Sequence, residues 1–272
     1  ARAAASCPPT AAMPTAEQLR AGAAGARDRG FLWRLRKDGR LSWLYGTVHV
    51  ARFEWTFPGP LLGVALMSSD VLALEFDLLD PEMQRRLAKA ATAPTRTALS
   101  PSQKSRLLKI ADAECVPAAD LDRLSPEMQV AALGSLVGRR IGLDPAYGID
   151  AVLASWARGS GKSIVSLETP ESQLRTLLQA TPAESRESID AALGEMEAGR
   201  AAPALERVAQ VWADGDYDAL SRYESWCDCV NTAADRAALA RLLDDRNPGL
   251  ADGIAALHAR GQAVFAAVGS LH

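Results

Sequence analysis

Residues 31–50 read FLWRLRKDGRLSWLYGTVHV, and this stretch decides how the fold begins. Two aromatic-rich runs, 31–36 and 41–46, flank a KDGR turn with Asp-Gly at its centre, which is the pattern of a β-hairpin. The second run ends at Gly46, and His49 follows three positions later. The sequence therefore predicts two paired strands, with a histidine just beyond the end of the second strand.

Three further apolar runs, at 71–77, 163–168 and 262–269, predict strands of the buried type. The helical patterns that separate them cover 58–70, 81–146, 148–162 and 170–261. Strands separated by long helical segments indicate an α/β fold, with α+β as the alternative. We expect a central mixed sheet, catalytic loops at the strand ends and a large helical insertion.

No low-complexity linker divides the chain, so the sequence predicts one domain over 30–272, after a flexible N-terminal segment over 1–29. The helical insertion covers about 80–160 and 170–261. Because the chain stops directly after a strand, we expect it to be truncated at its C-terminus.

Composition excludes some classes of protein. The net charge of -3 argues against a general nucleic-acid binder, and no apolar run approaches the roughly 20 residues that span a bilayer. The first residues, ARAAASCPPTAAMPTAEQ, resemble what remains after a signal peptide is removed, although an arbitrary start is the alternative. We therefore expect a periplasmic or secreted protein. Acylation of Cys7 as a lipoprotein is disfavoured, because Leu is missing where such sites usually carry it.

The four cysteines are Cys7, Cys115, Cys227 and Cys229. An even number in an exported chain predicts two disulfides. Since Cys227 and Cys229 are close in sequence, we expect each to pair with Cys7 or Cys115 rather than with the other. Free buried thiols are the alternative. A zinc site is disfavoured, because CDC lacks the usual ligand spacing.

Two tetrapeptides share the pattern G-[ST]-[VL]-H, namely GTVH at 46–49 and GSLH at 269–272, in a chain with only three histidines. Each tetrapeptide ends a predicted strand, where the catalytic loops of α/β sheets gather. Gly46 and Gly269 would allow a tight turn, and the hydroxyls of Thr47 and Ser270 would support the site. An imidazole in this position can bind a metal or act as an acid–base group.

Glu75 is the natural third group, because a carboxylate inside the apolar run VLALEFD is costly to bury unless it is paired, protonated or metal-bound. Together with His49 and His272 it predicts a site for Zn, Mn or Co that leaves positions open for water and substrate. If Glu75 is not a ligand, it would serve as the general base. The third histidine, His258, is expected to be structural.

Other polar residues are weaker candidates. Arg246 and Asn247, in DDRNP, form a solvated helix end or else reach the site, where Arg would bind an anionic group or polarise a carbonyl. Glu168 resembles Glu75 in its position at a strand end, although ETPE is also an ordinary helix start. Asp77 and Tyr45 flank the proposed ligands.

These stretches, in their order along the chain, resemble the TraB/GumN family over about residues 31–272. The resemblance rests on LWRLRKDGRLSWLYGTVHV, VLALEFD, YGIDAVLASWARGSGKSIVSLETPESQL, LLDDRNPGLADGIAAL and VFAAVGSLH. That family includes bacterial pheromone-shutdown proteins and the animal Tiki proteins, which are described as metal-dependent proteases that cleave the amino-terminal part of Wnt. It is similar to erythromycin esterases and to haem-binding ChaN proteins, which implies a fold like theirs.

The resemblance implies two G-x-x-H motifs and one glutamate as the working residues. In this sequence they are Gly46 with His49, Gly269 with His272, and Glu75. Arg246 and Asn247 match the RN pair of the family, which has no settled role.

The function predicted from these residues is an exported metal-dependent hydrolase, preferably a peptidase, that acts on a peptide or small-molecule substrate. One alternative is a non-catalytic binding protein for haem, metal or a short peptide, with a haem ligand among His49, His272 and Tyr45. A further alternative is a metal-free esterase in which His49 and Glu75 form the acid–base pair.

Overall fold

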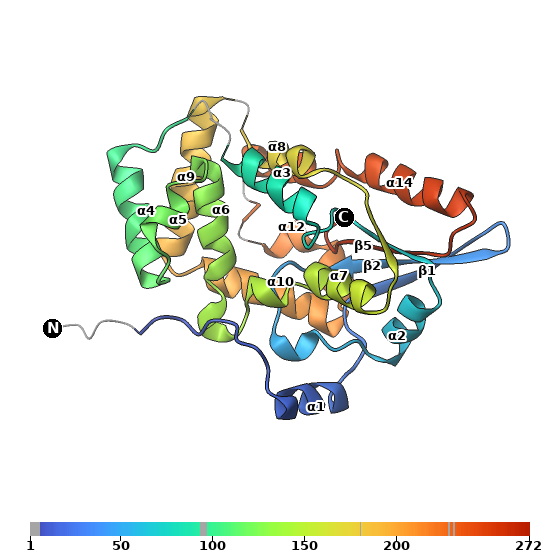
Figure 1. Cartoon of the computed structure of the whole chain (residues 1–272). Coiled ribbons are helices and arrows are strands. Elements are labelled where there is room, and N and C mark those ends of the chain that lie inside the picture. Colours follow the sequence, from blue (N-terminus) through green and yellow to red (C-terminus); the bar gives the residue numbers. More distant parts are fainter. Residues whose placement is uncertain (1–5, 93–96, 180, 228, 231) are drawn as a thin grey trace.

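The computed structural model describes residues 6–92, 97–179, 181–227, 229–230 and 232–272. Its centre is a mixed sheet of five strands in the order β1-β2-β5-β3-β4 (Figure 1). The strands are β1 (Phe31–Lys37), β2 (Arg40–Thr47), β3 (Val71–Leu74), β4 (Ser163–Ser166) and β5 (Val264–Gly269). β1 and β2 pair antiparallel, whereas β2, β5, β3 and β4 run parallel to one another. The predicted α/β architecture with a mixed sheet is confirmed.

The hairpin turns where the sequence predicted it. Asp38 and Gly39 both have positive φ, 52° and 74°, as a two-residue hairpin turn of the Asp-Gly type requires. The register then places Phe31 opposite Gly46 and Lys37 opposite Arg40. The predicted runs at 31–36 and 41–46 therefore form a single hairpin.

Two predicted strands are shorter than their apolar runs. β3 ends at Leu74 and β4 at Ser166, so Glu75 and Glu168 lie just past their strands. Glu75 was predicted inside the strand 71–77 but lies one residue past its end, where its backbone oxygen still accepts a hydrogen bond from Glu168 N at 2.7 Å. Both carboxylates consequently reach the same edge of the sheet, beyond the carboxyl ends of the parallel strands.

Several helices begin at a capping residue followed by Pro. Asp80 accepts hydrogen bonds from the N–H groups of Glu82 and Met83, and Ser100 forms a capping box with Gln103. The α-helices are α1 (Ala16–Ala24), α2 (Pro60–Met67), α3 (Pro81–Ala91), α4 (Pro101–Ala113), α5 (Ala118–Leu121), α6 (Pro126–Leu136), α7 (Ile149–Gly159), α8 (Pro170–Leu177), α9 (Pro182–Glu197), α10 (Ala201–Asp214), α11 (Tyr217–Ser221), α12 (Tyr223–Trp226), α13 (Ala233–Leu242) and α14 (Asn247–Ala259). Short 3-10 turns lie at Phe53–Trp55, Arg139–Ile141 and Pro145–Tyr147.

Helices cover both faces of the sheet. Successive side chains of a strand point to opposite faces, and both faces carry apolar residues that pack against helices. On one face Val71, Ala73, Val264 and Ala266 pack against Leu257 of α14. On the other face, Leu72, Leu74, Phe265 and Ala267 share a larger core with residues of α2, α7 and α10. The site described below lies beyond the carboxyl ends of the parallel strands, between these two layers of helices.

A separate apolar core holds the helical insertion together. Leu107, Leu121, Leu133, Ile189 and Leu193 are buried in it, and they come from α4, α5, α6 and α9. These helices form a group to one side of the sheet (Figure 1). Helices from before and after β4 therefore meet in one helical unit, whereas α7, α10 and α14, which the predicted insertion also included, pack against the sheet.

The cysteines form two disulfides, but not the predicted ones. Cys7 is bonded to Cys115, and Cys227 is bonded to Cys229. The expectation that neighbouring Cys227 and Cys229 would avoid each other was wrong, because the chain turns after α12 and Val230 N donates to Cys227 O at 3.2 Å. Since Cys7 is in a disulfide, its sulfur is not available for acylation.

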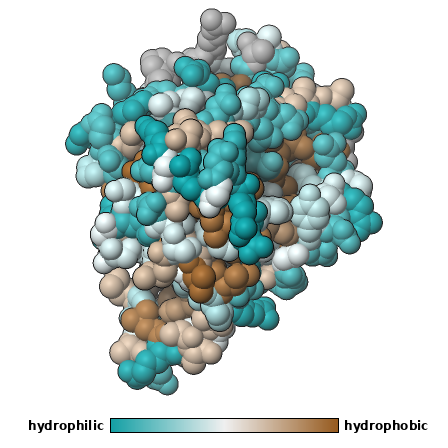
Figure 2. Space-filling view, turned by 90° about the vertical axis from the view of Figure 1, so that its right-hand side faces the viewer, coloured by the Kyte–Doolittle hydropathy of each residue, from teal (hydrophilic) through white to brown (hydrophobic). Residues whose placement is uncertain are grey.

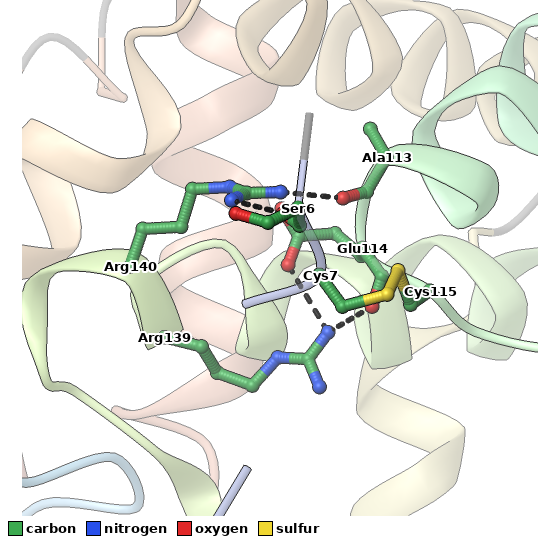
Figure 3. The surroundings of a disulfide bond; sticks show 7 residues. All are labelled: Ser6, Cys7, Ala113, Glu114, Cys115, Arg139 and Arg140. Atoms are coloured by element: carbon green, nitrogen blue, oxygen red, sulfur yellow. Dashed lines mark hydrogen bonds and ion pairs between the residues drawn. A yellow bond between two sulfur atoms is a disulfide. The ribbon is translucent and has the colours of Figure 1, made fainter. Parts of the chain in front are cut away.

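The first disulfide ties the N-terminal segment to the end of α4 (Figure 3). The guanidinium of Arg140 donates to Ser6 O at 2.8 Å and to Ala113 O at 2.7 Å, and so holds the backbone on both sides of the bond. Arg139 is ion-paired with Glu114 beside it. Among the described residues, no helix combines the length and the apolar character needed to cross a membrane.

Candidate active site

The two G-x-x-H motifs lie side by side at one edge of the sheet. β2 and β5 are parallel neighbours, Thr47 is opposite Gly269, and Ser270 N donates to Thr47 O at 2.9 Å. A Cβ on Gly46 would come within 3.0 Å of the Ser270 Cβ and 3.1 Å of its Cα. Glycine at position 46 therefore lets the two motifs approach this closely.

His49 is held by the buried carboxylate of Asp150, which was not predicted from the sequence as a site residue. Its Nδ1 lies 2.7 Å from Oδ2 of Asp150, in the first turn of α7, and the Thr47 hydroxyl donates to Oδ1 of Asp150 at 2.6 Å. Because an ionised carboxylate only accepts hydrogen bonds, Nδ1 of His49 carries the proton. In the part of the chain that the structure describes, Nε2 of His49 has no hydrogen-bond partner.

This ion pair joins an exposed imidazole, that of His49, to a buried carboxylate, that of Asp150. The His49 side chain is 67% exposed, whereas that of Asp150 is 8% exposed. The negative charge of Asp150, together with its hydrogen bond, raises the pKa of His49 to about 9. Burial disfavours ionisation of Asp150, but the imidazolium and the hydrogen bonds from His49 and Thr47 outweigh it and lower its pKa.

The second motif places His272 between an amide and a carboxylate. Its Nδ1 lies 2.8 Å from Oδ1 of Asn247, and its Nε2 lies 3.9 Å from Oε1 of Glu75. The same carboxylate oxygen accepts a hydrogen bond from Gly269 N at 2.7 Å. The His272 side chain is only 5% exposed, and burial lowers its pKa.

Glu75 is buried, and its charge is paired. Arg246 donates to Oε2 of Glu75 and, at 3.0 Å from Nε, to Oε1 of Glu168. The Gln173 amide also donates to both carboxylates. Burial disfavours ionisation of Glu168, but the hydrogen bonds from Arg246 and Gln173 outweigh it and lower its pKa. The Arg246 guanidinium therefore holds the two carboxylates together at this end of the sheet. Its positive charge offsets the free-energy cost of burying Glu75.

Arg246 and Asn247 stand next to each other where α14 begins. Arg246 contacts Glu75, and Asn247 contacts His272. Of the two readings left open by the sequence, the structure agrees with the one in which this pair reaches the candidate site.

Comparison with known proteins agrees with the resemblance seen in the sequence. A family model described as the TraB/PrgY/gumN family matches residues 31–272. The chain belongs to this family. No curated protein and no solved structure matched it.

Several candidates in this TraB-family chain lie outside the cluster. Tyr45 is buried and donates to Arg29 O at 2.9 Å, so its hydroxyl is engaged elsewhere. Asp77 is paired with Arg158. His258 is hydrogen-bonded to Ser42 and to Lys37 O, as expected of a structural residue. The Ser270 backbone, rather than a contact of its hydroxyl, joins the two motifs.

Asp150 and Gln173 belong to the cluster, but no sequence pattern marked them. Asp150 lies in YGIDAV, 101 residues after His49, and reads as an ordinary acidic residue in the first turn of a helix. Gln173 lies within an ordinary helix start, ETPESQ, and 98 residues separate it from Glu75.

The donor atoms expected for a metal are only partly assembled. Among the described residues, no three His, Cys, Asp or Glu side chains lie close enough to hold one ion. Nε2 of His272 and Oε1 of Glu75 lie 3.9 Å apart, somewhat farther than two ligands of a tetrahedral ion with bonds of about 2 Å. His49 does not complete that group in this arrangement.

A pocket of about 850 Å³ opens beside the second motif. Residues 268–272 form one of its walls, and side chains of β1 and α11 to α13 form the others, including Trp33, Leu35, Tyr217 and Tyr223. Elsewhere, the face seen in Figure 2 is mainly polar, with apolar patches between polar residues.

Proposed function

We propose that this member of the TraB/PrgY/gumN family is a metal-dependent hydrolase, and specifically a peptidase, whose divalent ion is held by His49, His272 and Glu75. The main support is the orientation of the two imidazoles. Each has its Nδ1 in a hydrogen bond with an oxygen acceptor, from Asp150 or Asn247, which leaves Nε2 free to bind. Metal-binding histidines usually have such a partner on the other nitrogen.

The contact between His272 and Glu75 supports the same proposal. With its proton on Nδ1, neutral His272 presents a lone pair on Nε2, and it faces a carboxylate oxygen 3.9 Å away. Two hydrogen-bond acceptors that face each other, such as this nitrogen and this oxygen, repel each other unless a proton or a cation lies between them. His49 would have to approach this pair for one ion to bind all three residues.

The residues around the proposed ligands have separate tasks. Arg246 pairs with Glu75 and orients it, Asn247 keeps the proton of His272 on Nδ1, and Asp150 does the same for His49. Because His49 is largely protonated at neutral pH, a metal must displace the proton from its Nε2. When bound, a Zn, Mn or Co ion would polarise the substrate carbonyl and bring the pKa of bound water towards neutrality.

The proposed substrate is a peptide or a small molecule taken into the pocket beside His272. We further propose that the protein works in the periplasm or outside the cell, since its two disulfides are typical of oxidising compartments.

The proposal is tested by adding Zn, Mn and Co to chelator-stripped protein while following the melting temperature. At an ion concentration of about 100 times Kd, binding should stabilise the folded state by about 2.7 kcal/mol. The rise in melting temperature should be lost in His49→Ala and in His272→Ala. Glu187→Gln, which changes an exposed carboxylate on α9, should keep it. Equal shifts in the wild type and both histidine variants would contradict the proposed ligands.

A metal-free esterase is the second candidate, and the pair formed by His49 and Asp150 favours it. A histidine held by a buried aspartate is a common acid–base arrangement, and with a pKa of about 9 His49 would donate a proton at neutral pH. Ester hydrolysis that persists in excess chelator and is lost in His49→Ala would support the esterase. Loss of hydrolysis in chelator, with recovery on adding Zn, Mn or Co, would exclude it.

A further inference from the structure

The two disulfides differ in what they can contribute to the fold. The bond between Cys7 and Cys115 spans 108 positions, whereas that between Cys227 and Cys229 spans 2. In the chain-entropy account, a cross-link stabilises a protein by restricting its unfolded chain, and the effect grows with the length of the closed loop. Holding the fold together therefore explains the first disulfide much better than the second.

The surroundings of the second disulfide suit thiol chemistry. Cys227 is buried, at 5% exposure, while Cys229 is exposed. The Tyr223 hydroxyl lies 3.0 Å from Sγ of Cys229 and 3.3 Å from Sγ of Cys227. One sulfur is thus open to an external thiol, and one hydroxyl can serve either sulfur as a hydrogen-bond donor.

Tyr223 is held firmly in this position. Its ring packs edge-on against Trp226, with ring centres 5.2 Å apart. The Trp226 indole donates to Ala219 O at 2.7 Å, and Arg207 stacks 4.3 Å from the centre of its ring. Burial raises the pKa of Tyr223, so the hydroxyl keeps its proton and remains a donor.

We propose that Cys227 and Cys229 form a redox-active pair that exchanges with external thiols, small molecules such as glutathione among them. A thiolate attacks Sγ of Cys229, the sulfur–sulfur bond breaks, and Cys227 leaves as a thiolate that accepts a hydrogen bond from Tyr223. A second thiolate attacks the external sulfur of the mixed disulfide and releases Cys229. In total, two external thiols give up two electrons and two protons, which leaves one external disulfide and two protein thiols.

The exchange can be measured on the intact protein in buffers with a graded ratio of reduced to oxidised glutathione. After acid quenching, free thiols are alkylated and the labelled cysteines are identified by mass spectrometry. Cys227 and Cys229 should become labelled at a reduced-to-oxidised ratio at least about tenfold lower than Cys7 and Cys115. Labelling of both pairs together, or labelling of Cys227 and Cys229 only after unfolding, would overturn the proposal.

Single cysteine variants identify the attacked sulfur. In Cys227→Ser the remaining Cys229 is exposed and should form a mixed disulfide with oxidised glutathione. In Cys229→Ser the remaining Cys227 is buried and should stay unmodified in the folded protein. The reverse pattern would overturn the assignment of Cys229.

Removal of one hydroxyl tests the donor. Tyr223→Phe should keep the ring packing and slow reduction of the pair by glutathione several-fold. The matched control is Tyr217→Phe on α11, where no sulfur contacts the hydroxyl among the described residues, and it should reduce at the wild-type rate. An unchanged rate in Tyr223→Phe would overturn the role of Tyr223.

Discussion

At the scale of single residues, each proposed ligand has a neighbour that fixes its orientation. Asp150 holds His49, Asn247 holds His272, and Arg246 holds Glu75. The ligand candidates could be predicted, because repetition of G-x-x-H and a carboxylate in an apolar run stand out in sequence. Asp150 could not, since only the fold brings it within 2.7 Å of a histidine 101 positions away.

Asp150→Asn should lower the pKa of His49 from about 9 towards its ordinary value of 6.5, because the neutral amide removes the charge that favours the imidazolium. The measurement is an NMR titration of the His49 ring in metal-free protein. Asp218→Asn, which removes an exposed carboxylate on α11, should leave that titration unchanged. A His49 that titrates near 9 in Asp150→Asn would show that Asp150 is not the cause.

The same pair should make stability depend on pH. Since Asp150 raises the pKa of His49 in the folded state, its stabilising effect is complete below about pH 6.5 and is lost as the pH rises through about 9. Unfolding by urea should therefore show the wild type losing its advantage over His49→Gln across this interval. The loss should be modest, because exposed His49 is screened by solvent. An advantage that grew with pH would contradict the pairing.

Asn247→Ala should weaken binding of Zn by about 10- to 100-fold, because His272 loses the acceptor that keeps the proton on Nδ1. Asn247→Asp keeps an oxygen acceptor and should restore most of the affinity. Calorimetric titration of chelator-stripped protein gives both affinities. Equal affinities in the wild type and Asn247→Ala would mean that Asn247 does not position a ligand.

At the scale of elements, the fold brings the two motifs together by making β2 and β5 parallel neighbours. The strands themselves were predictable from their apolar runs, and the hairpin from Asp-Gly. The early ends of β3 and β4, and the turn that closes Cys227 onto Cys229, depend on tertiary contacts and local chain reversal that apolar patterning does not encode.

Gly46→Ala should destabilise the protein by about 1–3 kcal/mol, because the added methyl would come within 3.0 Å of Ser270 and push the ends of β2 and β5 apart. Gly63→Ala is the matched control, since a Cβ there meets nothing within 4 Å in α2, where Ala is the better helix former. Urea unfolding measures both. Equal stability of Gly46→Ala and the wild type would refute the close approach of the motifs.

At the scale of the whole molecule, one covalent link joins the N-terminal segment to the helical unit built on α4, α5, α6 and α9. The sequence predicted helices in these segments, as part of an insertion over about 80–160 and 170–261, and it predicted two disulfides from the even number of cysteines. It did not predict the partners, because pairing depends on where the chain ends up in space rather than on spacing.

Cys7→Ser combined with Cys115→Ser should lower the free energy of unfolding by about 2–5 kcal/mol, since a cross-link over 108 positions is lost. Cys227→Ser combined with Cys229→Ser should lower it much less, because the loop it closes is very short. Guanidinium unfolding of the two double variants gives the comparison. A larger loss in the second double variant would contradict the chain-entropy argument.

The most direct test of the central claim, that the two G-x-x-H motifs form one metal site, is anomalous diffraction from crystals grown with Zn, Mn or Co. We expect one strong peak beyond the carboxyl ends of the parallel strands, within bonding distance of Nε2 of both His49 and His272 and of a Glu75 oxygen. A peak that contacts neither histidine, or no peak at this end of the sheet in crystals saturated with each ion, would contradict that claim.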